Sequence, residues 1–437
     1  MRTLAGLLTV LLATAAWPAE GQPEDNAAFF YWKAVGLMQP PRTLAQLEAV
    51  RFIEEELPLL SPRIFEARPA VLGWLLSEQA IRDALQDALP CAECDFGVRH
   101  DEGPFLDLSH VPRLTALCRR VCAMAQALEY AGRPEETARA YVGLLRMIRW
   151  LDTDRTLASG LAAADMMQTV LWSMESFLGG GPPAEGLVPL ADFFRETDGP
   201  LLHPADDLRA EAERLGRWLL REGPAAAAQM RRRIGEGPLA SALAKVEAAL
   251  AEEDRSVFDG WVAEYRSRMK ELADAFDQPF AQGALILKKR DAERAALLES
   301  PDTAPNPLLV LLVPVAVEIH QRLLLANAQW DMAALLCVAA ERQARTGSWP
   351  DVPKTLAKRL GRAFPMDPFS GERMHYRVIK GRPVLGVRIP RAMAESKRWI
   401  YTLDVAERAR RDTERTREAI RSARAIEFRE LFEPAAP

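Results

Sequence analysis

The sequence predicts a mainly α-helical fold of irregularly stacked helical hairpins, followed by a small C-terminal α+β module and a terminal charged helix. Alanine, leucine, arginine and glutamate dominate the 437 residues, and these residue types favour helix. Aromatic side chains make up only 7% of the chain, which argues against an all-β sandwich. Apolar side chains also recur at helical spacing in long segments that proline and glycine pairs separate.

The N-terminus has the pattern of a signal peptide. Arg2 precedes an uncharged apolar run over 4–17, and small residues such as Ala15 and Ala19 fit a cleavage site. We therefore predict a signal peptide over 1–21 and export to the periplasm or the cell exterior. The apolar run is shorter than the roughly 20 residues that a spanning helix needs. No transmembrane span is expected after cleavage, and an uncleaved N-terminal anchor is the alternative.

Glycine-rich and proline-rich stretches divide the rest of the chain. The strongest break is the run GGGPP, and a second one is the proline-rich linker before the most apolar helix. In chain order, the breaks predict an N-terminal helical domain with a cysteine-containing loop (22–182), a middle helical region (183–300), a linker and long helix (301–346), a small β-hairpin module (347–390) and a charged C-terminal helix (391–437).

Within these regions, periodicity and its interruptions place the individual elements. The N-terminal domain should contain helices at 26–38, 44–57, 64–89, 112–130, 135–151 and 156–178, with a loop at 90–109. The middle region should contain helices near 186–196, 204–222, 239–252, 255–275 and 279–299. A long helix at 308–345, kinked at Pro314, should lead to strands at 375–379 and 384–387 and to a polar helix at 403–432.

One helical hairpin shows a repeat-like pattern. The stretch GRPEETARAY at 132–141 resembles the turn and second helix of a tetratricopeptide repeat. Pro134 and Thr137 depart from that pattern, and no second copy follows at a fixed period. One unit cannot bury its own apolar face, so the pattern predicts hairpins of irregular length and no regular superhelix.

Four of the five cysteines lie in one block of loop and helix. Cys91 and Cys94 are spaced CxxC, and Cys118 and Cys122 lie one helical turn apart on one face. Because export favours disulfides, we expect at least one bridge from the loop to the helix. Free buried thiols and a metal site are the alternatives, and Cys337 is expected to be a buried small residue.

The densest polar cluster lies in the same loop. His100, Asp101 and Glu102 are consecutive, and His110 follows closely. Loops carry function more often than cores do, so these four residues are the candidates for a ligand or metal loop. A solvated loop held by the neighbouring cysteines is the alternative interpretation.

Recognisable catalytic motifs are absent from the sequence. It contains no HExxH, no GxSxG and no P-loop ending, and the S-x-x-K string that begins at Ser267 lacks its partner motifs. We therefore predict no catalytic residue, no metal and no cofactor. The net charge of −5 shows no basic surplus, which argues against a nucleic-acid partner. The mixed charges of the last helix predict a solvated face, with a docking helix for a partner as the alternative.

Three stretches together resemble a known set of proteins. They are NAAFFYWKAVGLM at 26–38, the segment 94–157 and the segment 347–377. The combination resembles uncharacterised exported helical proteins of planctomycete-like bacteria. This resemblance implies an exported helical protein and supplies no activity.

The C-terminal stretch also resembles part of the type II secretion pseudopilins. There a long helix leads to a G-x-x-P turn, matched by Gly347 to Pro350, and then to a D-P box, matched by Asp367 and Pro368. In this box Asp367 and Pro368 should start a turn, Gly371 should take positive φ, and Tyr376 should open a strand. Pseudopilins keep their long helix at the mature N-terminus, whereas this helix begins near residue 308.

Together these observations predict an exported helical scaffold or protein-interaction protein with an unidentified protein partner. An extracytoplasmic enzyme, hydrolase-like and with a site near His100 and His110, is one alternative. A component of a secretion or envelope assembly is the other, and the C-terminal box is what suggests it.

Overall fold

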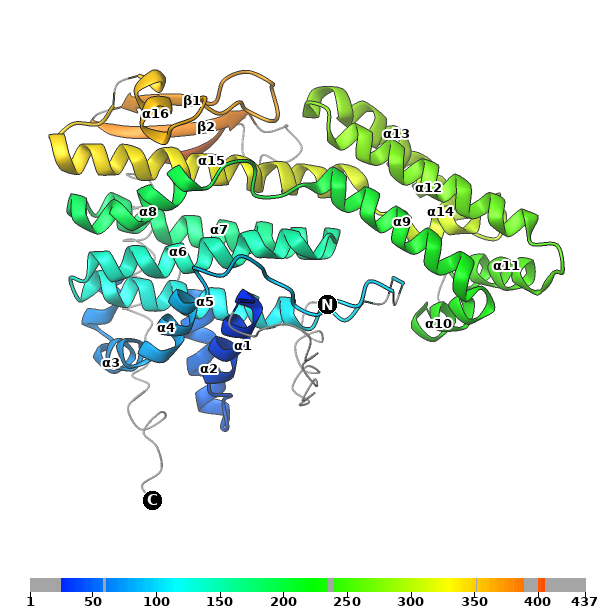
Figure 1. Cartoon of the computed structure of the whole chain (residues 1–437), viewed down its shortest axis with the longest axis horizontal. Coiled ribbons are helices and arrows are strands. Elements are labelled where there is room, and N and C mark those ends of the chain that lie inside the picture. Colours follow the sequence, from blue (N-terminus) through cyan, green and yellow to red (C-terminus); the bar gives the residue numbers. More distant parts are fainter. Residues whose placement is uncertain are drawn as a thin grey trace.

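The computed structural model describes residues 25–57, 60–101, 103–104, 106–234, 239–350, 352–379, 381–388 and 400–404. As the sequence predicts, this part of the chain is mainly α-helical, with a small sheet near the C-terminus (Figure 1). The predicted signal peptide lies outside the described residues, and so does the predicted polar helix at 403–432 apart from residues 403 and 404.

The N-terminal helices form a stacked body (Figure 1). In this body α5 packs against both α6 and α7, and α6 packs against α8. The α5–α6 hairpin turns at Gly132, whose φ of 71° suits a residue without a Cβ. The elements are α1 (Ala27–Leu37), α2 (Leu44–Arg51), η1 (Phe52–Glu56), η3 (Pro62–Glu66), α3 (Pro69–Ser77), α4 (Gln79–Asp87), α5 (His110–Tyr130), α6 (Pro134–Trp150), η4 (Leu151–Asp154), α7 (Leu157–Gly179) and α8 (Ala184–Glu196).

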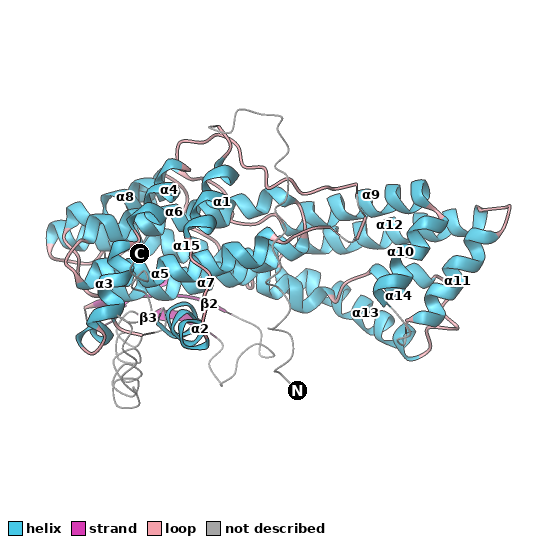
Figure 2. Cartoon of the chain, turned by 90° about the horizontal axis from the view of Figure 1, so that it is seen from below, coloured by secondary structure: helices cyan, strands magenta, loops and turns pink. Residues whose placement is uncertain are grey.

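A second group of helices extends from this body as an arm (Figures 1 and 2). The long helix α9 leads from the body into the arm, and α12 packs along it. Prolines begin α9, α10 and α14, where the missing N–H costs no hydrogen bond. The elements are α9 (Pro204–Glu222), α10 (Pro224–Ile234), α11 (Ala240–Ala251), α12 (Ser256–Phe276), α13 (Phe280–Glu299) and α14 (Pro307–Leu312).

The longest helix, α15 (Ala316–Thr346), connects the arm to the body. The helix predicted at 308–345 is interrupted around Pro314, because α14 ends at Leu312 and α15 begins at Ala316. The stretch Pro307–Thr346 is long and apolar enough to cross a membrane by length and composition alone. In the structure α15 packs against α7, α8 and α13 and buries Trp330, so we interpret it as a core helix.

The C-terminal module contains α16 (Pro353–Leu360) and a three-stranded antiparallel sheet. Strands β1 (His375–Ile379) and β2 (Arg382–Arg388) form the predicted hairpin, with Tyr376 opposite Leu385. The prediction of helix from residue 403 onward is wrong at its start, because β3 (Ile400–Asp404) pairs with β2. Helix α15 lies beneath the sheet (Figure 1) and contacts β2.

Candidate functional site

A sharp acidic turn between α6 and α7 carries the first group of polar side chains. Asp152 lies in η4, and Arg155 follows it with a φ of 50°, in the left-handed region. Among the described residues, Arg155 is the one non-glycine residue with a positive φ. Thr156 then caps α7 by accepting a hydrogen bond from the backbone N–H of Ser159 at 3.1 Å. Strained backbone of this kind concentrates at functional sites.

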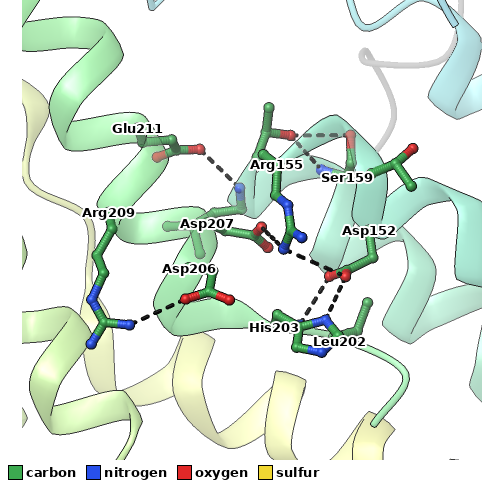
Figure 3. Close-up of polar contacts among 12 residues, drawn as sticks. Asp152, Arg155, Ser159, Leu202, His203, Asp206, Asp207, Arg209 and Glu211 are labelled. Atoms are coloured by element: carbon green, nitrogen blue, oxygen red, sulfur yellow. Dashed lines mark hydrogen bonds and ion pairs between the residues drawn. The ribbon is translucent and has the colours of Figure 1, made fainter. Parts of the chain in front are cut away.

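The start of α9 brings a histidine onto this turn. His203 Nδ1 lies 2.7 Å from Asp152 Oδ2, and the backbone N–H of His203 donates to Asp152 Oδ1 at 2.9 Å (Figure 3). The hydrogen bond to Asp152 raises the pKa of His203 above its ordinary value. The imidazole is 41% exposed, whereas Asp152 is buried, so the aspartate holds a solvent-accessible histidine in place.

A second carboxyl group lies next to this pair. Arg155 Nη1 is 3.8 Å from Asp152 Oδ2 and 3.9 Å from Asp207 Oδ1, so it lies between the two aspartates (Figure 3). Asp207 is 1% exposed. Burial first, and the charge of Asp152 second, raise the pKa of Asp207 to about 9. At neutral pH the Asp207 carboxyl group is therefore mostly protonated.

A separate buried network holds the same turn from the other side. Asp154 Oδ2 lies 2.7 Å from His110 Nε2 and accepts a hydrogen bond from Ser159 Oγ at 2.6 Å. Phe96 stacks on the imidazole of His110 at 4.7 Å between ring centroids. Serine nucleophiles need a histidine between the serine and the carboxylate. Here His110 and Ser159 both contact one carboxylate oxygen and are buried, so the network is structural.

A pocket of about 470 Å³ opens beside the turn. It lies between the loop that contains His100 and one face of α9. Four arginines and two carboxylates contribute to its wall, so positive charge predominates. The lining residues are His100, Asp101, Arg155, Ala210, Glu213, Arg214, Arg217, Trp218 and Arg221.

Buried Arg214 organises one wall of the pocket. Its Nη1 donates to His100 Nδ1 at 3.1 Å and to the carbonyl oxygen of Arg155 at 3.4 Å. An imidazole nitrogen that accepts a hydrogen bond carries no proton, so this contact favours neutral His100 with its proton on Nε2. Burial and the Arg214 charge lower the pKa of His100, in agreement with this geometry.

The loop is fixed against α9 by two further contacts. Arg221 Nη2 donates to the carbonyl oxygen of Asp101 at 2.9 Å. Gly103, with a φ of 72°, lies so close to Trp218 that a Cβ would be 2.4 Å from the indole ring. Only glycine fits this position without displacing the loop. The pocket wall is therefore formed by a tightly packed loop.

Arg217 is the residue best placed to receive a ligand. It is exposed, and its Nε donates to the carbonyl oxygen of Glu213 at 3.3 Å. No carboxylate pairs with Arg217 among the residues that the structure describes. Its charge is thus available to an anion that enters the pocket.

The residues predicted for a ligand loop have different outcomes. His100 and Asp101 line the pocket, whereas His110 does not and instead lies in the buried network with Asp154. Glu102 lies outside the described residues. Two of the four predicted residues therefore line the pocket, and His110 lies outside the pocket lining.

Sequence reasoning missed the contribution of α9. Arg214, Arg217 and Arg221 are spaced by three and four residues, which places them on one face of the helix. Interspersed glutamates made this face look like an ordinary solvated surface. One signal was available in the sequence. The face of α9 that lines the pocket carries three arginines, whereas Glu213 is its one carboxylate.

The predicted disulfide bridge is not present in the structure. All five cysteines are buried, and no disulfide joins any two of them. Cys118 and Cys122 are fully buried on α5, and burial followed by their mutual contact raises the pKa of Cys122. Burial also raises the pKa of Cys94. Thiols in this state behave as small apolar side chains and are unreactive.

The predicted turn box connects the C-terminal module to the arm. Asp367 accepts hydrogen bonds from the backbone N–H groups of Phe369 and Arg388, each at 2.9 Å, and Gly371 has a φ of 72°. The carbonyl oxygen of Pro368 accepts from the N–H of Phe280, the first residue of α13, at 3.3 Å. The hydroxyl group of Tyr376, in β1, donates to the carbonyl oxygen of Pro350 at 2.6 Å. These contacts give the box a structural role.

Within the described part of the chain, no group of three histidine, cysteine or acidic side chains could hold a metal ion.

Comparison with protein-family models, with curated proteins and with solved structures finds no match to this chain. The class that the structure defines is therefore a mainly α-helical protein with a small C-terminal sheet, and its function must be argued from the site.

Proposed function

We propose that the chain is an exported helical scaffold protein that binds an anionic group of a protein partner in the arginine-lined pocket. The observation that carries the proposal is the excess of positive charge in a pocket of about 470 Å³. Arginine side chains match the geometry of carboxylate oxygens, and a pre-formed pocket avoids the cost of ordering its groups on binding. An acidic side chain or a C-terminal carboxylate fits this chemistry.

The hydrolase alternative has less support. His203, held by Asp152, is the most accessible histidine–carboxylate pair of the site. However, the nearby serine, Ser159, is fully buried and already donates to Asp154. The envelope-assembly alternative rests on the C-terminal box. That box contacts α13 within the chain, so its residues have a structural role without any assembly partner.

Removing the available arginine should weaken anion binding. We expect Arg217→Ala to reduce the affinity for sulfate, or for a short polyglutamate peptide, by about tenfold, since a charge-assisted hydrogen bond contributes about 1.5–3 kcal/mol. Isothermal titration calorimetry at low ionic strength measures the change. The matched control is Arg209→Ala: Arg209 lies on the same helix but outside the pocket lining and pairs with Asp274 at 3.0 Å.

Because both variants remove one positive charge, long-range electrostatic effects cancel between them. The control should bind sulfate and the peptide nearly as well as the wild type. Equal affinities of the wild type and Arg217→Ala for both probes would refute the pocket as the binding site.

A further inference from the structure

Arg155 belongs to two groups of residues at once. Its side chain lines the arginine pocket, and its guanidinium group also lies 3.8 Å from Asp152 and 3.9 Å from Asp207. Both distances exceed hydrogen-bond length, and the side chain is 44% exposed. Arg155 is therefore held loosely by the aspartates and can turn its guanidinium group toward the pocket.

When Asp207 is ionised, above about pH 9, its carboxylate depends on Arg155 for charge compensation. Its Oδ1 atom is buried and accepts no hydrogen bond from the described residues. The turn before α7 supplies Asp152 and Arg155, and α9 itself supplies Asp206 and Glu211. The faces of α7 and α15 that meet at this carboxyl group present Gly160 and Leu323, which are apolar. Arg214 on α9 also interacts electrostatically with Asp207, but it is bound to His100 and to the carbonyl oxygen of Arg155. Arg155 is thus the loosely held positive charge near Asp207.

We propose that Arg155 couples anion binding to protonation of Asp207: an anion in the pocket draws the guanidinium group away, and Asp207 retains or takes up a proton from solvent. This proposal rests on the proposed function of the pocket. It assigns Arg155 a regulatory role besides that of a ligand-binding residue. The unusual backbone of Arg155, with a φ of 50°, fixes the position from which the side chain reaches both groups.

The direction of the pH dependence follows from the charges. Without ligand, burial raises the pKa of Asp207 to about 9 although Arg155 lowers it. When Arg155 turns to the ligand this lowering is lost, so the pKa of Asp207 is higher in the complex. Affinity should then be constant below pH 9 and fall above it. A displaced opposite charge changes a pKa by about one unit or more, so a loss of about tenfold is expected.

The experiment uses sulfate, whose charge is constant over this pH range, and the full-length protein. Calorimetric titrations at pH 7.5 and pH 10 should show about tenfold weaker binding at the higher pH. Near pH 9, buffers of different ionisation enthalpy should reveal proton uptake on binding. Asp207→Asn, which mimics the protonated carboxyl group, should bind with little pH dependence. The matched control, Asp165→Asn on α7, removes an exposed carboxylate that pairs with Arg322 at 2.6 Å, and it should keep the wild-type profile.

The outcomes separate this proposal from the proposed function. Sulfate binding with the same affinity at both pH values, or a pH dependence that persists in Asp207→Asn, would overturn the coupling and leave the anion site intact. Absence of sulfate binding at pH 7.5 would overturn the anion site, and the coupling with it. If Asp207→Asn does not fold, the proton uptake of the wild type decides, because uptake supports the coupling and its absence contradicts it.

Discussion

Replacing Arg120 with methionine should lower the free energy of unfolding by about 3–5 kcal/mol at pH 7. Arg120 is 1% exposed on α5 and pairs with Glu54 at 2.8 Å and with Glu78 at 3.1 Å. Its guanidinium group also lies over the ring of Trp74 at 4.5 Å. Methionine fills much of the same volume but removes the guanidinium group that the partly buried Glu54 and Glu78 share. The loss of these two ion pairs dominates the expected effect.

The deficit should depend on pH in a defined direction. Burial raises the pKa values of Glu54 and Glu78 above the ordinary value, even with Arg120 present. In the variant they should rise further. A carboxyl group whose pKa is higher in the folded state than in the unfolded state lowers the free energy of unfolding as the pH rises above the unfolded-state pKa. The stability loss of Arg120→Met should therefore be small near pH 4 and large at pH 7.

Urea denaturation at the two pH values measures this deficit. Arg113→Met is the matched control, because Arg113 lies on the same helix, is exposed, and lies over the ring of Trp32 at 5.2 Å. The control should lose less than about 1 kcal/mol. An equal deficit of Arg120→Met at both pH values would show that the carboxylates are not the cause.

Trp330→Ala should cost about 3–5 kcal/mol of unfolding free energy. Trp330 is fully buried at the contact between α15 and α8, with its ring 5.1 Å from Phe194 and 5.9 Å from Phe193. Alanine would leave a large cavity between these two helices. The indole N–H has no hydrogen-bond partner in the described part of the chain, so the apolar packing carries the effect.

Thermal and urea unfolding followed by circular dichroism measure the loss. Trp330→Phe is the control, because it keeps an aromatic ring and removes the unpaired N–H, and we expect it to lose less than half as much as Trp330→Ala. A loss below about 1 kcal/mol for Trp330→Ala would mean that the α8–α15 contact is not part of the cooperative core.

Local sequence signals account for much of the fold. Proline and glycine mark the α5–α6 turn at Gly132 and Pro134, and the hairpin of β1 and β2 follows the predicted strands. Strand β3 was missed because its pairing with β2 is non-local and a charged helical pattern begins inside it. A short strand beside such a pattern has too few residues to give a period of its own.

The site was less predictable, because its residues come from distant segments. The density of polar residues around His100 indicates a loop, and His100 and Asp101 in that loop line the pocket. The partners of that loop are Arg214 and Arg221 on α9, which lie 114 and 120 positions beyond His100 and Asp101, respectively. The turn before α7 and the start of α9 bring His203 together with two aspartates.

Crystals that contain a heavy anion reveal where the anion binds, and they decide whether the arginine pocket is an anion-binding site. Selenate has the shape and charge of sulfate and scatters X-rays anomalously. We expect a selenate peak in crystals of the wild type within hydrogen-bond distance of Arg217 and Arg155, and its loss in crystals of Arg217→Ala. Selenate peaks elsewhere on the surface with none in this pocket would show that the pocket is not the anion-binding site.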